Sequence, residues 1–277
     1  MHATSADPHR LALARRLERA EASACAAYVD ARSAVQPGVG AEWIEVGGAY
    51  AMFDGVGSPL TQTFGIGLFE PFLEAELERV ERFFREHGSD TFHEVCELAD
   101  PVSGALLEQR GYVRIEASTV MIRPTTGASA NPPGEITVRH IAPGEERHWA
   151  EVAARGWSSE SPDLAAFVRD LGLVMSHAAG SHCFLAELNG CPIASGGLNL
   201  AGGVALLAGA STILEARGRG AQSALLSARL AFAAERGADL AMVVTQPGSA
   251  SARNAERRGF RAAYSRSKWH RERSVPG

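Results

Sequence analysis

Short apolar runs in the second half of the chain predict a series of neighbouring strands. Cys183–Leu188 and Pro192–Leu200 flank Asn189-Gly190, a dipeptide typical of a two-residue β-turn. Gly202-Gly203 then leads into the apolar run Val204–Leu214. This order predicts a hairpin followed by a third strand, with the glycines serving turns and bulges.

The segments after this run predict a helix and a further strand. Gln222–Arg236 is rich in Ala, Leu and Arg and predicts a helix, whereas Leu240–Thr245 is an apolar run of strand length. Upstream, Glu135–Ile141 predicts a strand, and Pro143–Arg155 predicts a helix with its proline in the first turn. Ser161-Pro162-Asp163 opens another helix that is expected to reach His177.

The first half of the chain repeats part of this order. Leu73–His87 has apolar residues at helical spacing and takes the place of Gln222–Arg236. Phe92–Leu98 takes the place of Leu240–Thr245, and Glu108–Tyr112 parallels Glu256–Phe260. Strand-like segments follow both of the last two, at 113–122 and 261–268. Agreement in the order of four elements predicts two related domains.

A stretch of small residues and prolines near the midpoint divides the chain. Thr125–Gly134 holds a double proline and shows no apolar periodicity, as is typical of a linker. We therefore expect a first domain at 1–124, a linker at 125–134 and a second domain at 135–277. The first domain begins with an amphipathic helix over 10–32, which surface packing explains.

The turn between Val204–Leu214 and the following helix has the composition of an anion site. The first N–H groups of a helix lack partners inside the helix, and its dipole favours negative charge there. Gly218 and Gly220 permit close backbone approach, while Arg217 and Arg219 can bind phosphate oxygens. The alternative is an ordinary exposed strand-to-helix turn. No Lys-Ser or Lys-Thr follows, so a nucleotide P-loop is excluded.

This turn resembles the acetyl-CoA loop of the GCN5-related N-acetyltransferases (GNAT). Arg217, Gly220 and Gln222 take the three fixed places of the family pattern, although Gln222 stands where a small residue is usual. Ser251–Phe260 is similar to the short helix of that family that ends in Gly-Phe and returns as a strand. The resemblance covers residues 135–270. It implies an α/β (α+β) chain of two GNAT-like domains, each with a mixed, mostly antiparallel sheet flanked by helices.

The resemblance also implies acyl transfer from acetyl-CoA to an amine. In the family, two parallel strands splay apart and hold the pantetheine arm, and a strand N–H polarises the thioester carbonyl. Ala210, Ser211 and Thr212 match that strand edge, although ordinary strand residues are the alternative. The expected cofactor-binding residues are Ala210, Ser211, Thr212, Arg217, Gly218, Arg219, Gly220, Ala221, Gln222, Ser223 and Asn254.

The groups that transfer protons are less specific. Glu160 and His182 are candidate bases, each with a plain surface role as the alternative. The family tyrosine that protonates the leaving thiolate is replaced by Ala255, so solvent, the thiol itself or Tyr264 is expected to complete the reaction. Asn254 could bind the pantetheine arm or the acceptor, or equally cap a helix.

The first domain lacks such a loop. Gly65–Glu74 carries acidic residues in place of arginines, and bulky side chains where a diphosphate needs bare backbone. Carboxylates there would repel phosphate groups. We expect this half to cover the second domain, to shape the acceptor cleft or to bind a partner.

Composition limits the other function classes. The net charge of −5 over 277 residues argues against a general nucleic-acid binder. The four cysteines have no metal-like spacing, no segment approaches a membrane span, and no export signal is evident. We expect a cytoplasmic monomer or homodimer without a metal. An N-acetyltransferase is the leading hypothesis, ahead of a non-catalytic acyl-CoA sensor and of an interaction scaffold.

Overall fold

The computed structural model describes residues 7–127, 135–158 and 161–273. The chain divides into two compact units. Unit 1 comprises Met1–Ile122 together with Val244–Gly277, and unit 2 comprises Arg123–Val243.

The sheet of unit 2 is mixed. Its strand order is β10-β9-β8-β7-β6, with β9 and β10 parallel and the other neighbours antiparallel. These strands are β6 (Ile136–His140), β7 (Ser181–Leu188), β8 (Cys191–Ala201), β9 (Val204–Thr212) and β10 (Leu240–Thr245).

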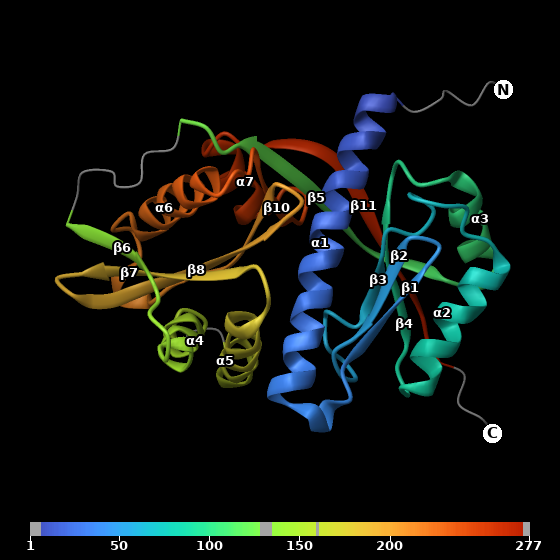
Figure 1. Ribbon diagram of the computed structural model, residues 1–277, viewed down its shortest axis with the longest axis horizontal. Coiled ribbons are helices and arrows are strands. Elements are labelled where there is room, and N and C mark those ends of the chain that lie inside the picture. The colour runs from blue at the N-terminus through green and yellow to red at the C-terminus, as the bar shows by residue number, and fades with distance from the viewer. Residues whose placement is uncertain (1–6, 128–134, 159–160, 274–277) are drawn as a thin grey trace. The chain divides into compact units, whose positions relative to one another are not determined.

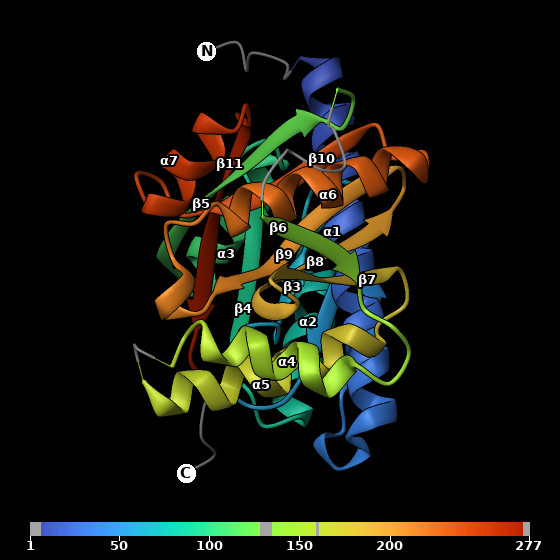
Figure 2. The ribbon, with the colours of Figure 1, turned by 90° about the vertical axis from the view of Figure 1, so that its left-hand side faces the viewer.

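Helices cover both faces of this sheet. Helix α6 (Ala221–Glu235) packs on one face, and α4 (Glu146–Arg155) with α5 (Pro162–His177) packs on the other (Figures 1 and 2). The short 3₁₀ helix η2 (Leu214–Ala216) joins β9 to the turn before α6. A cluster of α4 and β7 side chains forms the core under α4, namely Trp149, Ala150, Val152, Cys183 and Leu185.

Local signals in the sequence explain most of these boundaries. Asn189 and Gly190 both have positive φ, +52° and +76°, as the predicted two-residue turn requires. The Ser161 hydroxyl accepts the Leu164 N–H at 3.0 Å and caps α5. The expected start of the preceding helix at Pro143 is wrong, because α4 begins at Glu146.

The strands of unit 1 also run in mixed directions. Their order is β1-β2-β3-β4-β11-β5, with β3 and β4 parallel and the other neighbours antiparallel. The strands are β1 (Glu42–Val46), β2 (Ala49–Phe53), β3 (Gln62–Phe64), β4 (Thr91–Cys96), β5 (Val113–Pro124) and β11 (Arg261–Arg271).

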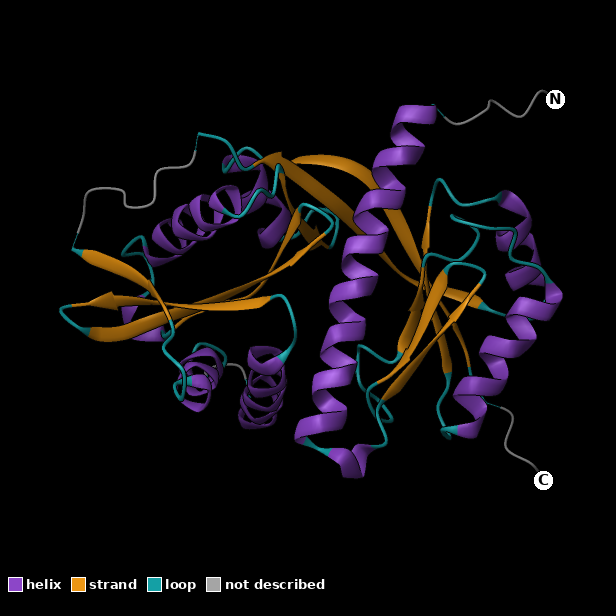
Figure 3. Ribbon diagram, in the orientation of Figure 1, coloured by secondary structure: helices purple, strands orange, loops and turns teal. Residues whose placement is uncertain are grey.

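The helices of unit 1 also lie on both faces of its sheet (Figure 3). The long helix α1 (Pro8–Val35), followed by η1 (Pro37–Val39), covers one face, and α2 (Glu74–Glu86) with α3 (Pro101–Gln109) covers the other. Helix α7 (Ala250–Arg257) precedes β11. Separate apolar clusters lie under α1 and under α2, around Met52 and Phe84 respectively.

The two halves share the predicted element order. In unit 1, α2 connects the parallel strands β3 and β4, and in unit 2, α6 connects the parallel strands β9 and β10. A short helix and a long strand follow in each case, α3 with β5 and α7 with β11.

The last strand pairs with strands of unit 1, whereas we expected it in the second domain. β11 pairs with β4 from Arg266↔Cys96 onward and with β5 along its length, so it is inserted between two strands of unit 1. This insertion buries the Trp269 side chain in the core under α2. The division at 135–277 therefore differs from the observed units, in which Val244–Gly277 belongs with the first half.

The expected linker lies mostly outside the described residues. Its first residue, Thr125, is buried, and its hydroxyl donates to the Ala238 carbonyl at 2.6 Å. Thr125 is therefore part of the packed structure of unit 2.

Candidate functional site

The turn before α6 presents a row of free backbone donors. Gly218 and Gly220 have φ values of +80° and +89°, which glycine adopts without strain. Among the residues that the structure describes, none accepts a hydrogen bond from the backbone N–H groups of positions 218–222. The turn at 217–220 is exposed, and a Cβ built on either glycine would meet no atom within 4 Å. The start of α6 can therefore bind an anion through its backbone.

The strand that leads into this turn has a free stretch of edge. β9 continues to Thr212, but its pairing with β10 ends at Leu206↔Met242. The residues beyond this point, 208–210, are exposed although they lie in the middle of the sheet. The two parallel strands therefore separate, as the family resemblance implied.

A β-bulge shapes this stretch. The register between β8 and β9 passes from Ser195↔Ser211 to Gly197↔Ala208, so two residues of β9 stand opposite one residue of β8. One of the two is Gly209, with φ at +62°. A Cβ there would lie 3.0 Å from the Met175 methyl group and 3.4 Å from the Trp149 ring. Glycine at this position therefore serves both the backbone conformation and the packing.

The three expected edge residues differ in their surroundings. Ala210 is exposed and is the second of the two bulged residues. Ser211 is buried, and its hydroxyl donates to the Ala153 carbonyl at 2.9 Å and lies 3.1 Å from the Ser195 hydroxyl. Thr212 is half-buried, and its hydroxyl accepts from Gln222 Nε2 at 2.8 Å. Their expected role as pantetheine ligands stays a prediction.

The two arginines of the turn also differ. Arg217 Nη2 donates to the Gly156 carbonyl at 2.8 Å, and Nε lies 3.4 Å from the Thr212 carbonyl. Its guanidinium thus ties the turn to the end of α4 and is directed to protein carbonyls. Arg219 is exposed. Of the two, Arg219 has the side chain that is better placed to reach a phosphate group.

The side chains at the start of α6 complete this region. Ala221 is buried, Gln222 and Ser223 are half-buried, and the Ser223 N–H donates to the Gly220 carbonyl at 2.9 Å. The Ser223 N–H is therefore already bonded, and the free donors are those of positions 218–222.

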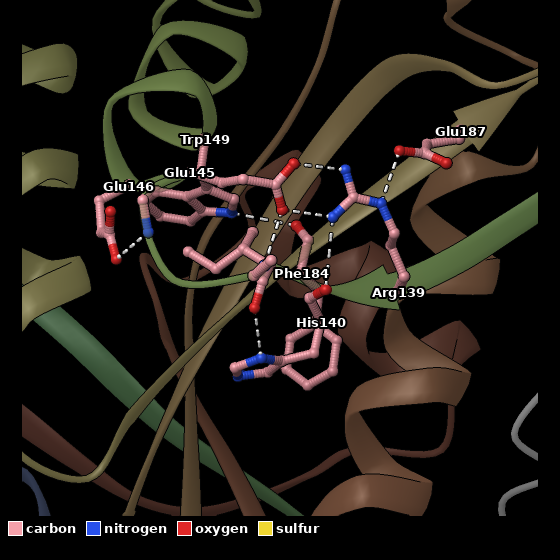
Figure 4. Close-up of polar contacts among 10 residues, drawn as sticks. Arg139, His140, Glu145, Glu146, Trp149, Phe184 and Glu187 are labelled. Carbon is pink, nitrogen blue, oxygen red and sulfur yellow. Dashed lines mark hydrogen bonds and ion pairs between the residues drawn. The ribbon is translucent and has the colours of Figure 1, made fainter.

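A polar network fixes α4 on the sheet (Figure 4). Arg139 from β6 forms a two-pronged ion pair with Glu145, at 2.6 and 2.8 Å, and also donates to Glu187 of β7 at 2.8 Å. The Arg139 hydrogen bonds, together with one from the Ala142 N–H, lower the pKa of Glu145 to about 2. The Glu145 carboxylate holds the backbone at Ala142 in a turn, which explains why the helix begins only at Glu146.

The same network places a tryptophan against the bulge. Trp149 is buried, and its indole Nε1 donates to the Phe184 carbonyl at 3.0 Å (Figure 4). Its ring lies beside the bulge glycine, Gly209. The packing of α4 therefore supports the strand segment that separates from β10.

A buried arginine on α6 lies on the other side of the bulge. Arg229 is 4 % exposed, and its Nη1 donates to the carbonyls of Gly197 at 2.9 Å and of Ala208 at 3.4 Å. Its Nε donates to the Leu225 carbonyl at 3.2 Å. Arg229 is not among the site residues predicted from the sequence. The available signal was a charged residue between Leu225, Leu226 and Leu230, on the apolar side of the predicted helix.

The candidate bases gain no assigned role from the structure. Glu160 lies outside the described residues. His182 is half-buried beside the Phe232 ring, with centroids 4.7 Å apart, on strand β7. Burial, and then the neighbouring His140 and Arg236, lower the pKa of His182. His182 lies on β7, two strands from β9. Its ring belongs to an aromatic cluster with His140 and Phe232 of α6.

Tyr264 and Asn254 belong to unit 1. Tyr264 is 3 % exposed, and its hydroxyl donates to Glu18 at 2.8 Å, while Arg266 also donates to that carboxylate at 2.6 Å. Burial, and then the Glu18 charge, raise the pKa of Tyr264. Its proton is therefore firmly held, and the structure offers no support for a role as the acid. Asn254 is exposed on α7, where its side-chain oxygen accepts from Arg257.

The corresponding loop of unit 1 is filled by its own side chains. The Phe69 ring occupies the space beside Gly48 and Gly65, where a Cβ would lie 2.6 and 2.8 Å from Phe69 atoms. Leu68 and Phe72 are buried. At the start of α2, the Glu76 carboxylate accepts the Leu73 N–H at 3.0 Å. Space and at least one donor of this helix start are therefore taken.

The described part of the chain contains no group of three His, Cys, Asp or Glu side chains placed to hold a metal ion. No helix in it is both long and apolar enough to cross a membrane.

Comparison with known proteins agrees with this geometry. Residues 146–260 match the sequence profile described as "Acetyltransferase (GNAT) family". This match begins at α4 and ends at the Gly-Phe pair after α7, so it contains the whole candidate site in unit 2. No curated protein sequence matches the chain significantly.

Solved structures show the same fold at low sequence identity. A GCN5-related N-acetyltransferase from Kribbella flavida matches with a TM-score of 0.59 and 19% identity, over 89% of this chain and 96% of that one. A second GCN5-related N-acetyltransferase, from Sphaerobacter thermophilus, matches with a TM-score of 0.53 and 17% identity, over 72% of this chain and 67% of that one. A tandem GNAT protein from the clavulanic acid biosynthesis pathway matches with a TM-score of 0.54 and 16% identity, over 73% of this chain and 70% of that one.

These matches confirm the mixed α/β fold and the resemblance that the turn motif carried. Residues 146–260 therefore match the GNAT acetyltransferase family, in a chain whose fold is that of GCN5-related N-acetyltransferases, a tandem one among them.

Proposed function

We propose that this protein is an acyl-CoA-dependent N-acyltransferase, and that it moves an acetyl group from acetyl-CoA to the amine of a small molecule or a protein. The observation that carries the proposal is the row of free N–H groups at positions 218–222, directly after a strand that separates from its parallel neighbour. A helix start of this kind binds phosphate oxygens through aligned donors and the helix dipole.

The proposed arrangement assigns each part of the ligand to a part of unit 2. The diphosphate of acetyl-CoA lies on the backbone of Gly218–Gln222, with Arg219 adding charge. The pantetheine arm runs along β9 at Ala208–Ala210, where β10 no longer pairs. A backbone N–H of this stretch then faces the thioester carbonyl, and such a donor typically lowers an acyl-transfer barrier by about 3–4 kcal/mol.

The reaction itself needs few side chains. The neutral amine attacks the thioester carbon, the carbonyl oxygen takes up negative charge, and the carbon–sulfur bond then breaks to release the thiolate of coenzyme A. One proton leaves the amine, through water or through Glu160, and one proton reaches the thiolate from solvent. Ala255 offers no proton at the place of the family tyrosine, so release of the thiolate depends on its own modest basicity.

Unit 1 has a different proposed role. Its equivalent loop is filled by Phe69, and its helix start is partly capped by Glu76, so we assign acetyl-CoA to unit 2 alone. Unit 1 would then contribute to the acceptor side or bind a partner. On the basis of composition, a cytoplasmic monomer or homodimer stays our expectation.

A thiol-release assay tests the proposal. Purified protein is mixed with acetyl-CoA and a panel of amines that includes polyamines, amino sugars, aminoglycosides and lysine-containing peptides. Free coenzyme A is followed with a thiol reagent, and the acetylated amine is confirmed by mass spectrometry. Release that depends on an amine supports the proposal, whereas absence of acetyl-CoA binding contradicts it.

The alanine at position 255 favours one second candidate, a non-catalytic acyl-CoA sensor. Acetyl-CoA binding in calorimetry, without turnover on any amine of the panel, would favour this candidate. An interaction scaffold that has lost the cofactor would show neither binding nor turnover.

A further inference from the structure

We propose that Arg229 is a positioning residue for acyl transfer: from beneath the sheet it holds the Ala208–Gly209 peptide, so that the Gly209 N–H faces the thioester carbonyl. This inference rests on the proposed function and names a residue that the acetyl-CoA loop motif does not contain.

Arg229 lies on the side of α6 that faces the sheet. The sheet-facing side of α6 is otherwise apolar, with Leu225, Leu226 and Leu230 all buried. Burying a guanidinium among such side chains costs free energy unless its donors are satisfied. Arg229 satisfies donors with main-chain carbonyls of β8 and β9, at the register shift between the two strands. The Arg229 guanidinium therefore lies at the bulge between β8 and β9.

Arg229 makes its strand contacts beside the bulge between β8 and β9. A bulge interrupts the ladder, so backbone groups beside it need other partners. Gly197 and Ala208 face each other next to the register shift, and both carbonyls accept from the same Nη1 atom. Arg229 thereby bridges β8 and β9 directly beside Gly209, the bulged residue with positive φ.

The contact between Arg229 and the Ala208 carbonyl affects both the direction and the strength of the Gly209 N–H donor. In a trans peptide the C=O and the N–H point in opposite directions. With the Ala208 carbonyl held by Arg229, the Gly209 N–H points away from α6. A cation on the carbonyl oxygen also draws electrons from the peptide, so its N–H becomes a stronger donor. Orientation and polarisation thus act together at the atom proposed to hold the oxyanion.

The residue opposite the bulge fits this role. Gly196 is the single β8 residue that faces the two bulged residues. A Cβ built on Gly196 would lie 3.1 Å from Cζ and 3.3 Å from Nε of Arg229. The missing side chain makes room for the guanidinium, and Gly196→Ala would displace it without removing it.

The test measures the thioester carbonyl of bound acetyl-CoA directly, so no acceptor amine is needed. Acetyl-CoA labelled with ¹³C at the carbonyl is bound to each protein, and the carbonyl stretch is measured by isotope-edited infrared spectroscopy. In parallel, calorimetry compares acetyl-CoA with S-ethyl-CoA, a thioether that lacks the carbonyl. The variants are Arg229→Met and Gly196→Ala. Arg236→Met is the matched control, because Arg236 is exposed and lies at the C-terminal end of the same helix.

We expect the bound carbonyl band of the wild type and of Arg236→Met to lie below that of free acetyl-CoA. In Arg229→Met and Gly196→Ala it should return toward the free position. The preference for acetyl-CoA over S-ethyl-CoA should fall about tenfold. This is less than the loss in kcat, about 10²–10³-fold, that follows removal of a whole oxyanion donor. Affinity for coenzyme A itself should stay within about twofold, since the diphosphate site is elsewhere on α6.

Three results would overturn the inference, and they have different meanings. An unchanged band and preference in folded Arg229→Met and Gly196→Ala removes the role of Arg229 and leaves the proposed function intact. Equal loss of affinity for both ligands and for coenzyme A shows a merely structural role. Absence of acetyl-CoA binding in the wild type removes the proposed function, and the inference with it. Melting curves check folding, and Gly196→Ala decides the matter if Arg229→Met does not fold.

Discussion

Gln222 Nε2 donates to Thr212 Oγ1 at 2.8 Å and so links the first turn of α6 to the end of β9. The link explains the departure from the family pattern, in which a small residue is usual at this place. The glutamine holds together the two elements between which the proposed ligand lies.

Removal of either partner should loosen the turn. Gln222→Ala and Thr212→Val should each lower the free energy of unfolding by about 0.5–1.5 kcal/mol, and the double variant should cost less than the sum. Denaturant unfolding of the four proteins measures this coupling, and strictly additive losses would contradict it. Acetyl-CoA affinity should fall in the Gln222→Ala variant.

The two arginines of the turn should separate into a structural and a ligand-binding residue. Arg217→Ala removes the donor to the Gly156 carbonyl, so it should reduce stability by about 1 kcal/mol and weaken acetyl-CoA binding through the distorted turn. Arg219→Ala should leave stability unchanged and reduce affinity, with a loss that shrinks as salt is added. Calorimetry at two salt concentrations and melting curves distinguish the two patterns. The reverse assignment would show that Arg217 turns to the phosphates on binding.

Tyr264 should prove to be structural. Tyr264→Phe removes the proton that Glu18 accepts in a buried site, which should lower stability by about 1–3 kcal/mol. The rate of acyl transfer should stay within about twofold, because that hydroxyl has a raised pKa and is held by Glu18. Steady-state kinetics on the best amine of the panel tests this. A large fall in kcat with a small fall in stability would identify Tyr264 as the acid after all.

Glu94 should make the stability of unit 1 depend on pH. Burial raises the pKa of Glu94 to about 7, with Arg266 and Lys268 opposing the shift and Glu21 and Glu18 adding to it. The folded state thus holds a proton that the unfolded state loses near pH 4.5. Stability from this group is full at low pH and is lost as pH rises from about 4.5 to 7, by about 1–3 kcal/mol.

Glu94→Gln tests that sign, because the amide imitates the protonated acid. The variant should match the wild type near pH 4.5 and exceed it above pH 7, in denaturant unfolding across this range. Glu97→Gln, an exposed position on the same stretch of chain, is the matched control and should leave the slope unchanged. A wild-type stability that rises between pH 4.5 and 7, with Glu94→Gln following it, would contradict the account.

Much of the fold could be predicted from the sequence because its signals are local. Asn189-Gly190 specifies a turn, Ser161 a helix start, and the glycine-rich turn at 217–220 the beginning of α6. The apolar run at 240–245 likewise predicted β10 within its observed bounds. Each depends on a few neighbouring residues, whose preferred dihedrals do not need the rest of the chain.

The features that escaped prediction depend on distant partners. β11 has the composition of a strand, but nothing in 261–271 says that it pairs with β4 and β5. The positive φ of Gly209 follows from the shifted register with β8, and the direction of the Arg217 side chain follows from the position of Gly156. Arg229 was visible as a charge on an apolar helix side, yet its purpose depends on a bulge in another element.

The central claim, that the backbone at the start of α6 binds the diphosphate of acetyl-CoA, is tested most directly by a matched pair of glycine variants. Gly220→Glu places a carboxylate at the start of α6, and Gly237→Glu places one just after its other end, at similar φ values of +89° and +79°. Both should carry the same backbone strain, about 1–2 kcal/mol.

Isothermal titration with acetyl-CoA should give at least about tenfold weaker binding for Gly220→Glu, because like charge and bulk exclude the diphosphate. Gly237→Glu should bind as the wild type does. Equal affinities in all three proteins would contradict the account.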